Sequence, residues 1–102
     1  MLVRTDLPEN QQLVQAVHAA HEAGIRFGDP HRISSVVVCS VPDEDHLLRA
    51  KEKLDHFGIR SSVFIEPDMQ NQSTALATEP IWGRLRKAFS NYPLWGFSLK
   101  EA

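Results

Sequence analysis

The chain has 102 residues, 42% of them hydrophobic and 24% charged, which predicts one globular domain. Its 11 basic and 13 acidic side chains give a formal net charge of −2, which argues against a strongly basic nucleic-acid-binding protein but leaves room for a local basic face. The single cysteine excludes an intrachain disulfide and fits a reducing compartment, and no apolar run reaches the length of about 20 residues that a membrane span needs, so we expect a cytoplasmic protein without a membrane partner.

The first third of the chain predicts a strand followed by a helix. The segment 1–5 is short and apolar and predicts the first strand. Pro8 suits the first helical turn and Gly24 is a suitable stop, so we expect a helix from about Pro8 to Ala23, with a loop over 25–32. Apolar side chains at helical spacing predict the buried face of this helix: Leu13, Val14, Ala16, Val17 and Ala20.

The middle of the chain predicts a buried strand and a second helix. Residues 33–41 contain three consecutive valines, 36–38, and then Cys39, a run typical of a strand buried on both faces at the centre of a sheet. In that position Cys39 is expected to be a packed thiol rather than a nucleophile. Pro42 and the acidic residues after it predict a helix that ends at Gly58. Its expected apolar face consists of Leu47, Ala50, Leu54 and Phe57.

Two more strands follow this helix. Residues 59–65 and 73–78 are interpreted as strands, and the polar turn 66–71 that joins them is too short for a helical crossover, so we expect an antiparallel pair. The two helical crossovers earlier in the chain predict right-handed parallel connections.

A third helix and an aromatic tail complete the predicted fold. Pro80 is expected to begin a helix that runs to about Ser90, and the tail 92–95 has enough aromatic area to dock on the body. The expected apolar face of this helix consists of Ile81, Leu85 and Phe89. The predicted order is β-α-β-α-β-β-α. We therefore expect a single α/β domain over residues 1–102, with a mixed four-stranded sheet flanked by helices.

A polar stripe on the first predicted helix is the first candidate site. Gln11, Gln15, His18 and Glu22 are spaced by four, three and four residues, which places them on one helix face. Such a face is often merely solvated. Alternatively, it forms a site in which His18 acts as acid, base or hydrogen-bond donor to a substrate.

Two further groups of residues could carry chemistry. Glu66 and Asp68 follow a predicted strand and could bind a cation, hold a catalytic group or only cap a turn. The third predicted helix holds a basic cluster that could contact phosphates, with two tryptophans nearby in sequence that could contact bases; a solvated basic face with core tryptophans is the alternative. These residues are Arg84, Arg86 and Lys87, with Trp82 and Trp95.

Metal binding has little support in the sequence. His18 and His21 are three residues apart, but no HExxH pattern or cysteine pair accompanies them. We therefore expect no metal site, and a metal-dependent enzyme that uses Glu66, Asp68 and His18 is the least favoured hypothesis.

Several short motifs, taken in order, resemble one family. The run Val3-Arg4-Thr5-Asp6-Leu7 and the later run Gln15-Ala16-Val17-His18-Ala19-Ala20 resemble the start of the type II (archaeal and eukaryotic type) peptidyl-tRNA hydrolases. That family has an Arg-x-Asp-Leu strand end followed by a Gly-Lys-x-Ala-Ala-Gln-x-x-His-Ala helix. Residues 36–38 with Pro42-Asp43-Glu44, and the segment 73–80, are similar to its later strands and second helix. The resemblance covers nearly the whole chain.

The resemblance implies both an activity and a set of site residues. It implies a mixed four-stranded sheet flanked by helices, hydrolysis of the ester that joins a peptidyl or aminoacyl group to the tRNA 3′ end without a cofactor, and a frequent homodimer. Residue by residue, Arg4 and Asp6 match the strand-end motif. Gln15 and His18 match the helix motif. Thr74 matches a threonine near the family's active site, and Asp68 lies in the loop of a functional aspartate.

The hypothesis of an esterase acting on charged tRNA gives each candidate residue an expected role. His18 would assist proton transfer or hold the 3′ adenosine, and Asp68 would orient water or His18. Hydrogen bonds to the carbonyl or ribose would come from Gln11, Gln15 and Thr74, and phosphate contacts from Arg4, Arg84, Arg86 and Lys87.

The chain departs from the family pattern at several positions. Gln11 stands where the family has a functional lysine, the loop 66–71 is shorter than the family's Asp-x-Gly-x-Thr loop, and Ala77-Thr78-Glu79 replaces Gly-Ile-Gly. Glutamine keeps a hydrogen-bond donor but loses the charge that could stabilise an oxyanion. The chain therefore resembles a divergent, bacterial-type branch of the superfamily. Two hypotheses follow: an esterase acting on charged tRNA, or a module that binds tRNA, RNA or a protein on the same fold and has lost the reaction.

Overall fold

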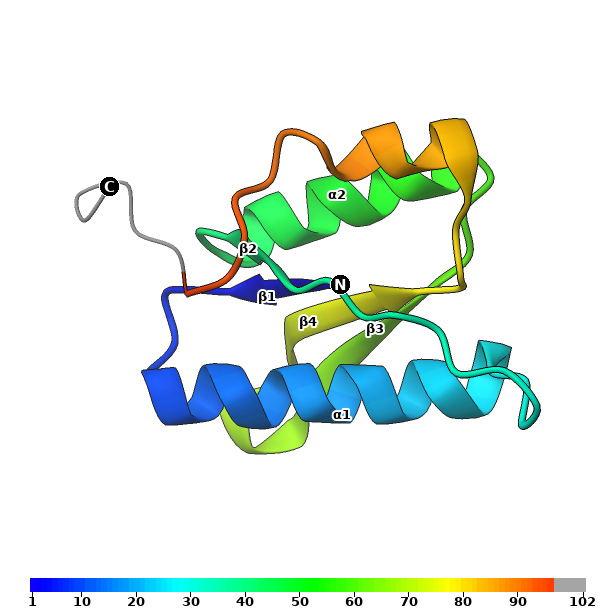
Figure 1. The fold of residues 1–102 in the computed structure, drawn as a ribbon. Helices are drawn as coiled ribbons and strands as arrows, with labels where there is room; N and C mark the ends of the chain where they lie inside the picture. The colour runs from blue at the N-terminus through cyan, green and yellow to red at the C-terminus, as the bar shows by residue number, and fades with distance from the viewer. Residues whose placement is uncertain (97–102) are drawn as a thin grey trace.

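In the computed structural model, which describes residues 1–96, a four-stranded mixed sheet separates two layers of helices (Figure 1). Helix α1 (Glu9–Phe27) covers one face, and helix α2 (Glu44–His56) covers the other together with the 3₁₀ helix η2 (Gly83–Phe89). This arrangement confirms the expected single α/β domain.

The sheet has the order β2-β1-β4-β3. Its strands are β1 (Leu2–Arg4), β2 (Cys39–Val41), β3 (Ser61–Glu66) and β4 (Gln72–Thr78). β1 is parallel to β2, and β4 is antiparallel to both β1 and β3, so the predicted antiparallel final pair is confirmed. A one-turn 3₁₀ helix, η1 (Pro67–Met69), joins β3 to β4. Among the helices of residues 1–96, none has the length and hydropathy of a membrane span.

Helix α1 buries a different face from the one predicted. Leu13 and Val17 are each 59% exposed and Val14 is 41% exposed, so three of the five residues of the predicted apolar face point outward, while Ala16 and Ala20 are half-buried. The face against the sheet consists of Gln12, Gln15, Ala19 and Ala23. The prediction was wrong because the sheet presents small side chains there, Ala75 and Ala77 beside Val3, which allow close approach. In addition, both glutamine amides find buried hydrogen-bond partners.

Helix α1 also continues past its predicted stop. Gly24 lies within the helix, which ends at Phe27, so residues 25–27 are helical rather than part of a loop. The Gly28 N–H donates to the Gly24 carbonyl at 2.9 Å and closes the helix. Tertiary contacts extend the last turn, because Phe27 packs on the core and Arg26 Nη1 donates to Ser62 Oγ at 3.2 Å.

Strand β2 is short and lies at an edge, where the sequence predicted a long central strand over 33–41. Val36 and Val37 are 64% and 53% exposed, and β1 takes the central position instead. The prediction failed because the C-terminal segment covers the outer edge of β2: the Ser40 N–H donates to the Pro93 carbonyl and the Trp95 N–H to the Val38 carbonyl, both at 2.8 Å. Cys39 is a buried free thiol, as expected.

Helix α2 follows the sequence prediction closely. Asp43 caps its N-terminus by accepting the His46 N–H at 2.9 Å, and Gly58, with φ +74°, follows its end. Three of the four predicted apolar-face residues are buried: Leu47, Ala50 and Leu54. Phe57, the fourth, is 51% exposed because the helix has already ended at His56.

The third helix is a 3₁₀ helix that begins at Gly83, three residues after the predicted start. Ala88 is its buried residue and Leu85 is exposed, contrary to prediction, while Ile81 and Phe89 pack half-buried against the core. Side chains at i and i+3 eclipse in a 3₁₀ helix, so a face calculated with the α-helical period does not apply. The tail docks as predicted, with Trp95 Nε1 donating to Gln12 Oε1 at 2.7 Å.

Candidate functional site

A β-bulge organises the candidate site. The register between β3 and β4 shifts from Phe64–Ala75 to Ile65–Ser73, which leaves Thr74 as an extra residue in β4. Ala75 belongs to the core under α1 and Leu76 to the core under α2, so strict alternation would turn Thr74 toward α2. The bulge instead lets Thr74 Oγ1 donate to Gln15 Oε1 on α1 at 2.7 Å.

Gln15 is the centre of this cluster. Its side chain is fully buried, and its Oε1 accepts from Thr74 while its Nε2 donates to Glu66 Oε2 at 3.0 Å and to Gln11 Oε1 at 3.4 Å. The Thr74 hydroxyl therefore fixes the orientation of the Gln15 amide, because an oxygen must face the donor and the NH₂ group must then face the carboxylate.

Glu66 stands where β3 ends and the connecting turn begins. Its Oε1 accepts the backbone N–H of Asp68 at 3.2 Å and so caps η1. The pKa of Glu66 is lowered, first by the hydrogen bond from Gln15 and then by the hydrogen bond from the Asp68 N–H, with a smaller electrostatic contribution from His18. The group is therefore a carboxylate near neutral pH. The turn closes through Gln70 and Asn71, both at φ 58°, in the left-handed region.

His18 forms the exposed rim of the cluster. Its imidazole stacks on Phe64 with ring centroids 4.6 Å apart and an interplanar angle of 3°. One helical turn further on, Glu22 accepts a hydrogen bond from Ser62 Oγ and lies 3.7 Å from the Arg26 guanidinium. The predicted polar stripe therefore lies along β3, from Glu66 back to Ser62, rather than facing only solvent.

Arg4 and Asp6 brace the sheet next to the cluster. Arg4 is buried, and its Nε and Nη2 donate to the Asp6 carboxylate at 2.9 and 2.7 Å. Its Nη1 donates to Gln72 Oε1 at 2.8 Å and to the Ser73 carbonyl at 3.0 Å, next to the bulge. The hydrogen bond to Asp6 is also the main reason that the pKa of Arg4 is raised. These contacts hold the end of β1 against β4.

The remaining predicted residues lie elsewhere. Asp68 contributes its backbone N–H to Glu66, and its own side chain is exposed. The basic cluster Arg84, Arg86 and Lys87 is exposed on η2, on the opposite face of the sheet from α1 (Figure 1). Trp82 is 64% exposed, with the Arg32 guanidinium 5.3 Å from its ring. Within residues 1–96, no three metal-ligating side chains come together.

Two members of the site were not singled out from the sequence as partners of the helix. Glu66 was singled out with Asp68 because both follow a predicted strand, but no signal in the sequence linked it to Gln15 on the helix. Phe64, which supports His18, carried no signal beyond an apolar residue in a strand. In comparisons with known proteins, no family model matches this chain and no curated protein matches it. The similarity to peptidyl-tRNA hydrolases therefore stays a prediction carried by short motifs.

Proposed function

We propose that the chain hydrolyses the ester bond of peptidyl-tRNA, or of a related charged tRNA, and releases free tRNA. The observation that supports this function best is an ionised Glu66 carboxylate held by buried Gln15, with the exposed imidazole of His18, from the same helix, stacked on Phe64 of the same strand. A carboxylate and an imidazole in one polar cluster are groups that general base catalysis of ester hydrolysis can use. From the composition and the resemblance, we also propose that the protein is cytoplasmic and forms a homodimer.

In this reaction the His18 imidazole takes a proton from water, whose oxygen attacks the ester carbonyl carbon. The Glu66 carboxylate stabilises the imidazolium that results. When the bond between the carbonyl carbon and the ribose oxygen breaks, His18 returns the proton to that oxygen, which leaves as the free tRNA hydroxyl. Gln11 donates an amide N–H to the carbonyl oxygen, and the exposed Asp68 carboxylate orients the water.

Thr74 and Gln15 are positioning residues in this mechanism. Both are fully buried, and each satisfies the other. Their hydrogen bond presents the Gln15 NH₂ group to Glu66 and so keeps the carboxylate at the end of β3. Loss of either group would move Glu66 rather than remove a group that contacts substrate.

A second function is favoured by one observation. The hydrogen bonds of Gln11, Gln15, Glu66 and Thr74 within residues 1–96 involve no lysine or arginine. A cluster without a cation provides little stabilisation for an oxyanion. A catalytically impaired module that binds tRNA, RNA or a protein on the same fold is therefore the alternative.

A hydrolysis assay on charged tRNA tests the proposal. We expect His18→Ala to lower the rate by about 10²- to 10⁴-fold, the usual contribution of a general base. His21→Ala is the matched control, because His21 is also exposed on α1 but lies away from Glu66. An unchanged rate in His18→Ala would remove His18 from the reaction.

The same assay distinguishes the alternative. Wild-type protein that binds charged tRNA in a salt-dependent way without cleaving it supports the binding module. Cleavage gained in Gln11→Lys would show that the missing cation is what limits the reaction.

A further inference from the structure

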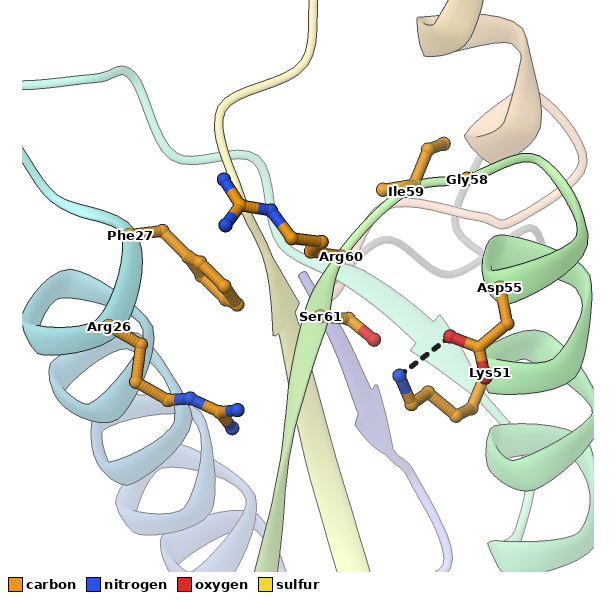
Figure 2. A pocket seen from close by; sticks show the side chains of 8 residues that line it. All are labelled: Arg26, Phe27, Lys51, Asp55, Gly58, Ile59, Arg60 and Ser61. Carbon is orange, nitrogen blue, oxygen red and sulfur yellow. Dashed lines mark hydrogen bonds and ion pairs between the residues drawn. The ribbon is translucent and has the colours of Figure 1, made fainter.

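A cavity of about 550 Å³ lies at the opposite end of β3 from Glu66. The C-terminal ends of α1 and α2 stand on either side of the strand, with Arg26 and Phe27 extending from α1 and Lys51 and Asp55 from α2 (Figure 2). The start of β3 and the turn before it complete the lining with Gly58, Ile59, Arg60 and Ser61.

Ser61 carries an unsatisfied donor at this cavity. Within residues 1–96, its Oγ is the buried side-chain polar atom that has no hydrogen-bond partner. The residue is 8% exposed, and its hydroxyl points to the side of β3 on which α2 lies (Figure 2). A buried hydroxyl without a partner is costly, and a ligand in the cavity could supply that partner.

The backbone of Ser61 offers a second donor at the same place. β3 is an edge strand that pairs only with β4 in the described sheet. The Glu79 N–H donates to the Arg60 carbonyl at 3.0 Å, so Arg60 faces β4 through its backbone. Because hydrogen-bonded and non-hydrogen-bonded pairs alternate along an antiparallel ladder, the Ser61 N–H points away from β4 to the open edge.

The lining offers cationic donors to an anion, although each cation is already in an ion pair. Arg26, Lys51 and Arg60 pair with Glu22, Asp55 and Glu79, of which Asp55 alone lies in the lining. Lys51 Nζ donates to Asp55 Oδ1 at 2.8 Å, which engages one of its three N–H groups. Arg60 uses Nε and Nη2 on Glu79 Oε1, at 3.2 and 3.1 Å, which leaves Nη1 for a ligand.

The guanidinium groups of both lining arginines lie near the Phe27 ring. The guanidinium carbons of Arg26 and Arg60 lie 5.5 and 5.2 Å from the centre of the Phe27 ring. Arg26 is also paired with Glu22 at 3.7 Å and donates to Ser62 Oγ. Guanidinium groups fixed in this way bind an oxyanion with less loss of side-chain freedom.

We propose that this cavity binds a phosphate group. Ser61 donates to it through Oγ and the backbone N–H, and Lys51 and Arg60 neutralise its charge. The cavity lies five residues along β3 from Glu66, which corresponds to roughly 17 Å. The assignment of this phosphate rests on the proposed function: it belongs to the backbone of the bound tRNA near its single-stranded 3′ end. Free inorganic phosphate is the other ligand that could occupy the same site.

Titration with inorganic phosphate and with a single-stranded RNA ending in CCA tests the site. We expect both probes to shift the Ser61 amide resonance in the wild-type protein. Ser61→Ala should weaken binding roughly 10- to 100-fold, the usual effect of a lost hydrogen bond to a charged group. Arg49→Gln is the matched control: it removes one charge from α2 at a different pocket, lined by Val41 and Tyr92, and should bind like the wild type.

The stability of Ser61→Ala provides an independent check. Because Ser61 Oγ has no hydrogen-bond partner among residues 1–96, the variant should keep the wild-type thermal midpoint or exceed it while losing phosphate binding. Wild-type protein that binds neither probe would overturn the proposal. So would a Ser61→Ala variant that binds phosphate as the wild type does, or one that unfolds at a lower temperature.

The source of the phosphate is settled by comparing the probes with the hydrolysis assay. RNA binding that Ser61→Ala weakens supports the phosphate site even if wild-type protein fails to hydrolyse charged tRNA, in which case only the proposed function is lost. If the wild type hydrolyses charged tRNA, Ser61→Ala should raise KM about tenfold or more and leave kcat unchanged. Binding of inorganic phosphate without RNA binding would overturn the assignment to tRNA.

Discussion

Removal of the Thr74 hydroxyl should destabilise the protein by more than the net contribution of an ordinary hydrogen bond. Thr74 and Gln15 are both fully buried, and Thr74 Oγ1 donates to Gln15 Oε1 at 2.7 Å. Thr74→Val keeps nearly the same shape but leaves the Gln15 oxygen without a donor where water does not reach. An unsatisfied buried polar group costs about 1–3 kcal/mol, so we expect a loss of about 2 kcal/mol in the free energy of unfolding.

Thermal and urea denaturation followed by circular dichroism measure this loss. For a domain of this size, 1 kcal/mol corresponds to roughly 4–8 °C, so the midpoint of Thr74→Val should fall by roughly 8–16 °C. Thr74→Ser is the control, because it keeps the hydroxyl and loses only a methyl group, at a cost of about 1 kcal/mol.

The double variant Gln15→Met/Thr74→Val tests the reasoning itself. Once both partners are apolar, neither leaves the other unsatisfied, so the double variant should be less destabilised than the sum of the two single variants. Additive losses would refute the argument. A Thr74→Val protein within about 0.5 kcal/mol of the wild type would also refute it, since that is the effect of an ordinary surface substitution.

Three other predictions concern the same region and its surroundings. The pKa of Glu66 in the folded protein is depressed below its ordinary value of 4.5, so the stability that its carboxylate contributes is complete above pH 4.5 and is lost as the pH falls through the folded pKa. Glu66→Gln should remove this part of the acid dependence of stability. A carboxyl titration by NMR measures the pKa shift directly. Arg4→Lys should lower the free energy of unfolding by about 3 kcal/mol in urea denaturation, because an ammonium cannot replace the guanidinium that donates to four acceptor atoms. Near-wild-type stability would show that these hydrogen bonds are dispensable. Val17→Lys should change stability by less than about 0.5 kcal/mol, whereas Ala19→Val should cost about 1–3 kcal/mol through overpacking, and the opposite order in thermal melts would mean that α1 buries the apolar face after all.

Helix α2 was predictable because its burial is local in origin. Its apolar residues Leu47, Ala50 and Leu54 recur at helical spacing, and the cap at Asp43 and stop at Gly58 lie at the two ends of that pattern. In helix α1 the same reasoning chose the wrong face. Its buried polar side chains are satisfied by residues far along the chain: Gln15 bonds Thr74, 59 positions away, and Gln12 bonds Trp95, 83 positions away. The spacing of apolar residues along a helix carries no information about such distant partners.

The place of a strand within the sheet was not predictable for a related reason. Composition predicted a central position for the valine-rich segment 33–41, but strand order depends on which edges find partners. β1 pairs on both sides, with β2 and with β4, and so becomes central although it has only three residues. The outer edge of β2 is covered by Pro93 and Trp95, whose role there depends on the path of the chain after η2.

The candidate site shows how far helix spacing alone can go. The intervals between Gln11, Gln15, His18 and Glu22 placed these residues on one face, and in the structure that face lies along β3. The one residue that spacing could not place is Thr74, since regular alternation would put it on the opposite face of the sheet from Gln15. A single extra residue in β4 reverses this, so the polar cluster depends on the bulge as much as on the helix.

The same geometry decides where a nucleic-acid substrate could be held. Arg84, Arg86 and Lys87 lie on the other face of the sheet, so they cannot contact a phosphate next to His18 without the substrate crossing an edge of the sheet. The open edge of β3 has the proposed ester-cleaving cluster at one end and the cavity with Ser61, Lys51 and Arg60 at the other. In a chain with a net charge of −2, a polyanion would be held there by the donors of Lys51 and Arg60 that their ion pairs with Asp55 and Glu79 leave free, because screening at physiological salt limits the reach of more distant charges to about 8 Å.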